Sequence, residues 1–156
     1  MIDNLFTFLI VITLVIVSFI DSKTMTIPDS LNIFIAIIGL TWSLSSPYIN
    51  LIEVALGSIA GALPLFIIDR LTMLIVKKYG FGLGDVKLMA ACGVFLGWQL
   101  VAVAFFFAFV TGALFGIYLI LIKQAKKDSY MPFGPFLCFG VFISMFFGDF
   151  LIRGFF

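Results

Sequence analysis

The sequence predicts an all-α membrane protein, a bundle of about six transmembrane helices with a glycine-rich bend before the fourth. Hydrophobic residues make up 63% of the 156 residues and charged residues only 11%. The mean hydropathy of +1.29 lies far above that of soluble globular domains. The apolar residues fall into runs separated by short polar segments, as in multi-pass membrane proteins. No repeat or second domain is visible, so we expect residues 1–156 to form one integral-membrane domain.

The first three apolar runs predict helices over Leu5–Ile20, Leu31–Leu44 and Leu51–Lys78. No basic region precedes the first run and no small-residue cleavage site follows it, so a helix is predicted there rather than a signal peptide. Pro28 restricts the residue before it to extended backbone angles, which separates the first helix from the second.

The third run carries a glycine pair and a charged pair. Gly57 and Gly61 have the GxxxG spacing that lets a neighbouring helix approach closely. Ordinary small-residue spacing is an equally open interpretation. We interpret Asp69 and Arg70 as the start of a cytoplasmic extension rather than a buried pair.

The last three runs predict helices over Val86–Trp98, Leu100–Ile122 and Phe136–Ile152. Alanines and glycines make one face of the first of these helices small, which suits tight packing. Cys92 and Cys138 both lie inside apolar runs, so we interpret them as small core residues rather than a disulfide.

The lysines orient the predicted helices. Loops one, three and five carry seven of the nine basic residues, and loops two and four carry none. The seven are Lys23, Lys77, Lys78, Lys87, Lys123, Lys126 and Lys127. By the positive-inside rule these loops are cytoplasmic and both termini lie outside. Asp21 and Asp85 then fall on the same, cytoplasmic face of the membrane.

The composition excludes several kinds of chemistry. Because the chain has no histidine, it cannot hold an HExxH metal site, a Ser-His-Asp triad or a Cys-His pair. It also has no Cys-x-x-Cys pair, so we expect neither a metal nor another cofactor. A net charge of +1 without a basic patch argues against a nucleic-acid partner. Any catalysis must therefore use Asp, Glu, Lys, Ser or Tyr.

Residues 80–88 concentrate three glycines, one aspartate and one lysine between two apolar runs. Glycines permit backbone angles that other residues resist, so we expect a sharp bend that brings Asp85 to the start of the next helix. A carboxylate at the mouth of a membrane helix is costly and indicates a functional site. Capping of the helix N-terminus is the alternative role for this aspartate.

A second carboxylate, Asp21, stands at the end of the first apolar run. Asp29 follows it and is a good N-cap for the second helix, with Pro28 as loop support. In order along the chain, these segments and the glycine-rich bend resemble the type IV prepilin peptidase family of GxGD membrane aspartyl proteases. The matching residues are Asp21, Ile27-Pro28-Asp29, Gly82-Leu83-Gly84-Asp85, Val86-Lys87-Leu88, Gly93, Leu96-Gly97-Trp98 and Pro132-Phe133-Gly134-Pro135-Phe136.

The resemblance implies an intramembrane aspartic endopeptidase of the inner (plasma) membrane, with Asp21 and Asp85 as the catalytic pair. One carboxylate, ionised, would take a proton from water, and the other, protonated, would polarise the scissile carbonyl. The implied substrates are membrane-inserted prepilins or pseudopilins, cut on the cytoplasmic side of their hydrophobic segment. Gly93 and Gly97 are expected to help receive the substrate helix. The residues expected to shape the site are Gly82, Gly84, Lys87, Pro132, Gly134 and Pro135.

Many members of this family carry an N-terminal region with paired Cys-x-x-Cys motifs, which is linked to methylation of the new N-terminus. The present sequence has no such motif, so we expect a single-activity short form without methyl transfer. A peptidase for preflagellins or for Flp-class pilins is the nearest alternative. A non-catalytic membrane scaffold or small transporter is another, in which Asp21 and Asp85 would be caps or a proton relay.

Overall fold

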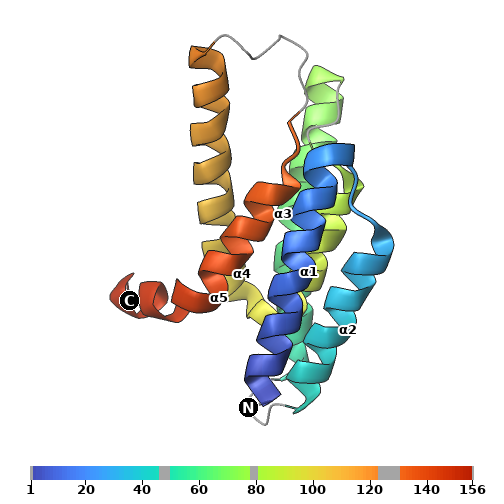
Figure 1. Cartoon of the computed structure of the whole chain (residues 1–156), viewed down its shortest axis with the longest axis vertical. Coiled ribbons are helices and arrows are strands. Elements are labelled where there is room, and N and C mark those ends of the chain that lie inside the picture. Colours follow the sequence, from blue (N-terminus) through green and yellow to red (C-terminus); the bar gives the residue numbers. More distant parts are fainter. Residues whose placement is uncertain (1, 46–49, 78–80, 123–130, 156) are drawn as a thin grey trace.

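The computed structural model describes residues 2–45, 50–77, 81–122 and 131–155. These residues form five helices and no strand: α1 (Ile2–Thr24), α2 (Asp29–Ser45), α3 (Leu51–Val76), α4 (Leu83–Leu121) and α5 (Gly134–Phe155) (Figure 1). All but α2 are long and apolar enough to cross a membrane. The prediction of an all-α, multi-pass membrane protein is therefore confirmed.

The predicted number of about six helices is not confirmed, because α4 covers both the fourth and the fifth predicted run. The helix is nevertheless broken at Gly97, whose φ of 74° and ψ of 166° are not helical. Glycine adopts a positive φ without the steric cost that other residues meet. In Figure 1 the yellow-green first part of α4 descends beside α3, and the gold second part rises on the other side of the molecule. The boundary expected at this position is a kink within one helix.

The first helix is longer than predicted and contains Asp21 in its last turns. It ends at Thr24, and the next residue, Met25, has a φ of 52° and donates its backbone N–H to the carbonyl of Asp21. A residue with positive φ just after the last turn is a common helix stop. The carbonyl of Pro28 then accepts hydrogen bonds from the first turn of α2, so Pro28 is the N-cap residue just before the second helix.

Close backbone contact joins α3 to α4, as the GxxxG hypothesis predicted. A Cβ atom added to Gly57 would collide with the carbonyl oxygen of Gly93, and one added to Gly61 would collide with that of Met89. In a membrane, where lipid is as apolar as the helix surface, such close packing drives helix association. Cys92 and Cys138 are free and buried, which confirms their interpretation as core residues.

Candidate active site

Three segments that are distant in the sequence meet at one end of the helix bundle. They are the end of α1 with the following loop, the start of α4, and the start of α5. A Cβ atom added to Gly84 would lie only 3.1 Å from the Cβ of Ile27, so the first two segments are in contact. The backbone N–H of Gly134 donates to Oδ2 of Asp21 over 3.0 Å, which joins the third segment to the first.

Asp21 lies in α1 with only 4% of its surface exposed. The backbone of Gly134 holds one of its carboxylate oxygens, as just described. A Cβ atom on Gly134 would stand 2.6 Å from the same oxygen, so only glycine allows this approach. The glycine in the Pro-Phe-Gly-Pro turn therefore fixes the orientation of the carboxylate.

Asp85 lies in the first turn of α4 and is 8% exposed. Its Oδ2 accepts a 3.2 Å hydrogen bond from the backbone N–H of Gly82, which caps the helix. Its Oδ1 is buried and has no partner among the described residues. A buried polar atom without a partner is rare enough to need an explanation. One oxygen of Asp85 is thus held by the backbone and the other is free.

The structure brings Asp21 and Asp85 together although 64 positions separate them in the sequence. The two carboxylates are near enough for electrostatic repulsion between them. Each also has one oxygen held by a glycine N–H, the first from the start of α5 and the second from the residue before α4. The capping role considered for Asp85 is therefore present, and it leaves the second oxygen available.

The glycines of the GLGD segment act for a different reason from the one expected. Gly82 has a φ of −76° and ψ of 148°, which any residue adopts, and a Cβ there would make only ordinary van der Waals contacts, the nearest with Oδ2 of Asp85 at 3.6 Å. Gly84 lies inside the helix and matters because Ile27 packs against it. Neither residue has the positive φ that glycine alone adopts easily, so neither supplies the sharp bend that the sequence predicts, and Gly80 lies outside the described residues.

Three phenylalanines pack beside the pair. The ring of Phe81, just before the GLGD segment, lies edge-on to that of Phe133 with 4.9 Å between centroids. Phe109, in the second part of α4, contacts Phe133 at 5.5 Å. The rings tie both parts of α4 to the turn that holds Asp21. Pro132 and Pro135 flank this turn, and Pro135 is the second residue of α5, where a missing N–H costs nothing.

Lys87 and Asp29 form an ion pair, with 2.7 Å between Nζ and Oδ2. Their side chains are 53% and 61% exposed. Asp29 is the first residue of α2, where the helix dipole stabilises a negative charge. Its carboxylate oxygens accept hydrogen bonds from Lys87, which lies on another helix. The pair joins α2 to α4 about half a helical turn beyond Asp85, and nothing in the sequence indicated it.

The interpretation of Asp69 as part of an exposed extension is wrong. Asp69 is 2% exposed, and its Oδ1 accepts a 3.3 Å hydrogen bond from the backbone N–H of Phe81. Its spacing could have revealed this, because it continues the buried row of Gly57, Gly61 and Leu65 at intervals of four. Asp69 thus holds the segment that leads into Asp85. Arg70, its neighbour, lies over the ring of Phe66.

Two further expectations meet the structure here. Gly93 faces the backbone of α3 and is buried, so it cannot receive a substrate helix. Among the residues that the structure describes, no group of three or more histidine, cysteine, aspartate or glutamate side chains could hold a metal ion.

Comparisons with known proteins agree with the motifs. A model of the type IV leader peptidase family matches residues 8–117, a range that contains both buried aspartates of the pair. No solved structure matches the chain.

Curated relatives are similar over nearly the whole chain. A protein named prepilin leader peptidase/N-methyltransferase from Aeromonas salmonicida strain A449 is 36% identical over 140 residues, which are 90% of this chain and 48% of the relative. The protein of the same name from Legionella pneumophila is 37% identical over 153 residues, 97% of this chain and 53% of the relative. The chain spans about half the length of the curated relatives it matches.

Proposed function

The chain belongs to the type IV leader peptidase family, and on this premise we propose that it is an aspartic endopeptidase that removes the leader from membrane-inserted type IV prepilins or pseudopilins. The observation that carries the proposal is the geometry of the pair. Two buried carboxylates from different helices face one site, each is oriented by a backbone N–H, and Oδ1 of Asp85 has no partner within the described part of the chain. That free oxygen is the atom available to a water molecule or a substrate carbonyl.

In the proposed reaction the pair shares one proton, because two adjacent negative charges repel each other. The ionised carboxylate removes a proton from water as it attacks the scissile carbonyl carbon. The protonated carboxyl polarises the carbonyl oxygen and then supplies the proton that the leaving amine needs. The backbone N–H groups of Gly134 and Gly82 keep both carboxyl groups in place during this exchange.

We further propose six crossing segments, with the two parts of α4 counted separately, and a site that faces the cytoplasm of the inner membrane. At about 1.5 Å per residue the part after Gly97 reaches about 36 Å, whereas the part before it reaches only about 21 Å. A bilayer core is about 30 Å thick, so the shorter first part would leave Asp85 in a recess below the surface. Lys23, Lys77 and Lys87 lie near this end of the bundle, which supports a cytoplasmic orientation.

The proposal is tested by expressing the protein with candidate prepilins, pseudopilins, preflagellins and Flp-class pilins. Cleavage is scored as a mobility shift and located by mass spectrometry. We expect at least one prepilin or pseudopilin to lose its leader on the cytoplasmic side of its apolar segment. If the protein is inserted in the membrane and cuts no substrate of the panel, the result contradicts the peptidase proposal and favours a scaffold or transporter.

A further inference from the structure

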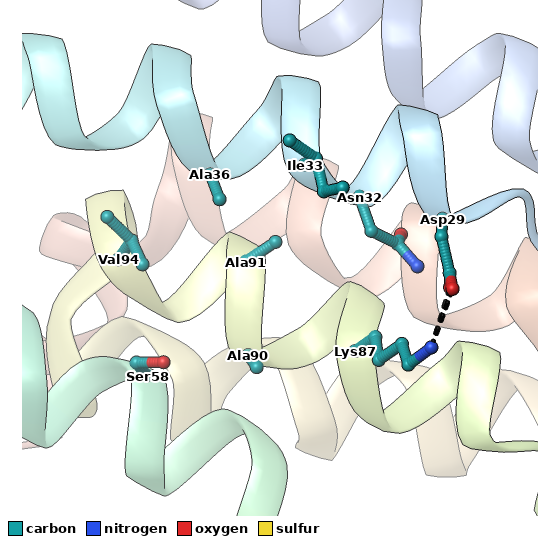
Figure 2. Close-up of a pocket in the computed structure, with 9 residues that line it drawn as sticks. All are labelled: Asp29, Asn32, Ile33, Ala36, Ser58, Lys87, Ala90, Ala91 and Val94. Atoms are coloured by element: carbon teal, nitrogen blue, oxygen red, sulfur yellow. Dashed lines mark hydrogen bonds and ion pairs between the residues drawn. The ribbon is translucent and has the colours of Figure 1, made fainter.

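A groove of about 360 Å³ lies between α2, α3 and the first part of α4 (Figure 2). It begins at the ion pair of Asp29 and Lys87 and continues along α4 as far as Val94. Lys87 is two residues, or about 3 Å of helix rise, beyond Asp85. The mouth of the groove therefore lies at nearly the same level of the bundle as the proposed active site, on another side of α4. From Lys87 to Val94 a helix rises about 10 Å, which carries the groove away from the site towards the middle of the bundle.

Four of the nine residues that line the groove have small side chains. Ala36 comes from α2, Ser58 from α3, and Ala90 and Ala91 from α4 (Figure 2). In a membrane such surfaces allow another helix to approach closely and to gain van der Waals contacts. Small residues alone do not make a binding site, since lipid chains can also cover them.

Asn32 provides the second, independent observation. Its side chain lines the groove, only 4% of its surface is exposed, and neither its amide nitrogen nor its amide oxygen has a hydrogen-bond partner among the residues that the structure describes. Figure 2 shows the amide pointing towards Lys87 at the edge of the groove. A buried amide without a hydrogen-bond partner is unfavourable until a polar group reaches it.

The ion pair at the mouth of the groove can move to admit such a partner. Asp29 and Lys87 are both more than half exposed, and exposed ion pairs contribute little to stability. Their opening would uncover the amide of Asn32 from the side of the active site. An acidic or amide group on an incoming helix could then bond to Lys87, to Asn32 or to both.

We propose that this groove binds the transmembrane helix of the substrate, directly on the membrane side of the bond that is cut, and that a polar side chain of that helix bonds Asn32. This inference rests on the proposed peptidase function. Its partner is an apolar helix that carries one hydroxyl, amide or carboxyl group close to its cytoplasmic end.

A second groove, between α1 and α5, serves as the internal comparison. Its volume is about 470 Å³, and Val15 and Phe139 are among its lining residues. The unpartnered buried side-chain atoms in the described part of the chain belong only to Asn32 and Asp85, and neither residue lines this groove. Lipid chains can therefore fill it without leaving a polar group unsatisfied.

Photo-crosslinking distinguishes the two grooves. A photoreactive amino acid is placed at Ile33 in the first groove or at Val15 in the second, both exposed, in an Asp85→Asn background that retains uncut prepilin. We expect the Ile33 position to crosslink the apolar segment of the prepilin about tenfold more than the Val15 position, as a buried docking helix demands. Equal yields, or a stronger crosslink from Val15, would overturn the assignment.

Kinetics provide the second test. Ala90→Phe fills the groove, and Ala102→Phe puts the same side chain on an exposed position of α4 as a control. We expect Ala90→Phe to raise KM about tenfold with kcat nearly unchanged, which is the pattern of binding lost equally from the ground state and the transition state. Ala102→Phe should change neither KM nor kcat. Asn32→Leu should raise KM in the same way, and Asn32→Ser should restore part of the affinity. If the wild type cuts prepilin and Ala90→Phe has the same KM, the groove assignment fails but the peptidase proposal stands. If a photoreactive residue at position 33 crosslinks prepilin but the wild-type protein never cuts it, the groove assignment stands and the peptidase proposal fails.

Discussion

Two kinds of aspartate lie at the same end of this bundle. Asp21, Asp69 and Asp85 are almost fully buried, and each accepts a hydrogen bond from a backbone N–H. Asp29 is largely exposed and bonds a lysine. A backbone donor belongs to a fixed segment, so the buried carboxylates and the chain around them hold each other in place. The exposed pair joins two helices through flexible side chains, which is a much weaker constraint.

The largest effect should come from the pair itself. Asp21→Asn and Asp85→Asn keep the size of the side chain and an oxygen that accepts from the neighbouring glycine N–H, but an amide cannot exchange a proton. We expect each change to lower cleavage by about 10³-fold or more while membrane insertion is unaffected. Rates are measured on a purified prepilin in detergent or vesicles.

The double variant sharpens this test. Residues that act as one unit are already disabled by removal of either, so the two losses should not add. Cleavage near the wild-type rate by either single variant would remove that aspartate from the proposed mechanism.

The next effect concerns the glycine that touches Asp21. In Gly134→Ala the new Cβ would stand 2.6 Å from Oδ2 of Asp21, so either the carboxylate or the turn must shift. A displacement of about 1 Å in an active site can cost about a hundredfold in rate, and we expect a loss of that order in kcat. Gly82→Ala is the matched control, because a Cβ there meets only open space and ordinary contacts.

The control also tests why these glycines matter. If Gly82→Ala is as damaging as Gly134→Ala, the segment needs conformational freedom at Gly82 that its backbone angles do not indicate. The measurement is kcat for both variants, with circular dichroism to compare helix content.

Asp69 should have an intermediate effect, because it acts on the site only through Phe81. Asp69→Leu removes the acceptor of the Phe81 N–H, so the segment before Asp85 loosens and kcat should fall about tenfold or more. Asp69→Asn keeps an acceptor oxygen and should restore most of the rate with KM unchanged. A merely structural role would instead lower the amount of folded protein in both variants. A loss as deep as that of Asp85→Asn, without rescue by asparagine, would mean that Asp69 itself exchanges protons.

The sequence predicts the helices of this fold more completely than it predicts the contacts of the site. Apolar runs alone identify the helices, because a membrane forces backbone hydrogen bonds into helical form. They do not distinguish a loop from a kink: the sequence predicts a boundary between Trp98 and Leu100, where the structure has one helix that is kinked at Gly97. The end of α1 was also misplaced, because the polar character of Asp21 suggested a loop where the helix continues.

Local patterns found the pair, but they could not find its supports. The Gly134 and Asp21 contact spans 113 positions, and the Lys87 and Asp29 contact spans 58, so only tertiary packing brings them together. Asp69 is different, since its place in a four-residue repeat of buried positions is visible in the sequence. The charge of its side chain and the arginine beside it concealed this spacing.

The smallest effect should come from the exposed ion pair. Asp29→Asn removes its charge but keeps a polar first residue for α2. Ion pairs exposed to solvent contribute about 0–1 kcal/mol, so we expect cleavage within about threefold of wild type and little change in thermal stability. Lys87→Met removes the same contact, so its kcat should match that of Asp29→Asn, but it also removes a side chain that lines the substrate groove, so its KM should rise. If Asp29→Asn alone is inactive, the claim that the exposed aspartate matters less than the buried ones is wrong. The catalytic carboxylate of the first segment would then be Asp29, the residue that begins α2, and Asp21 would serve to hold the Gly134 turn.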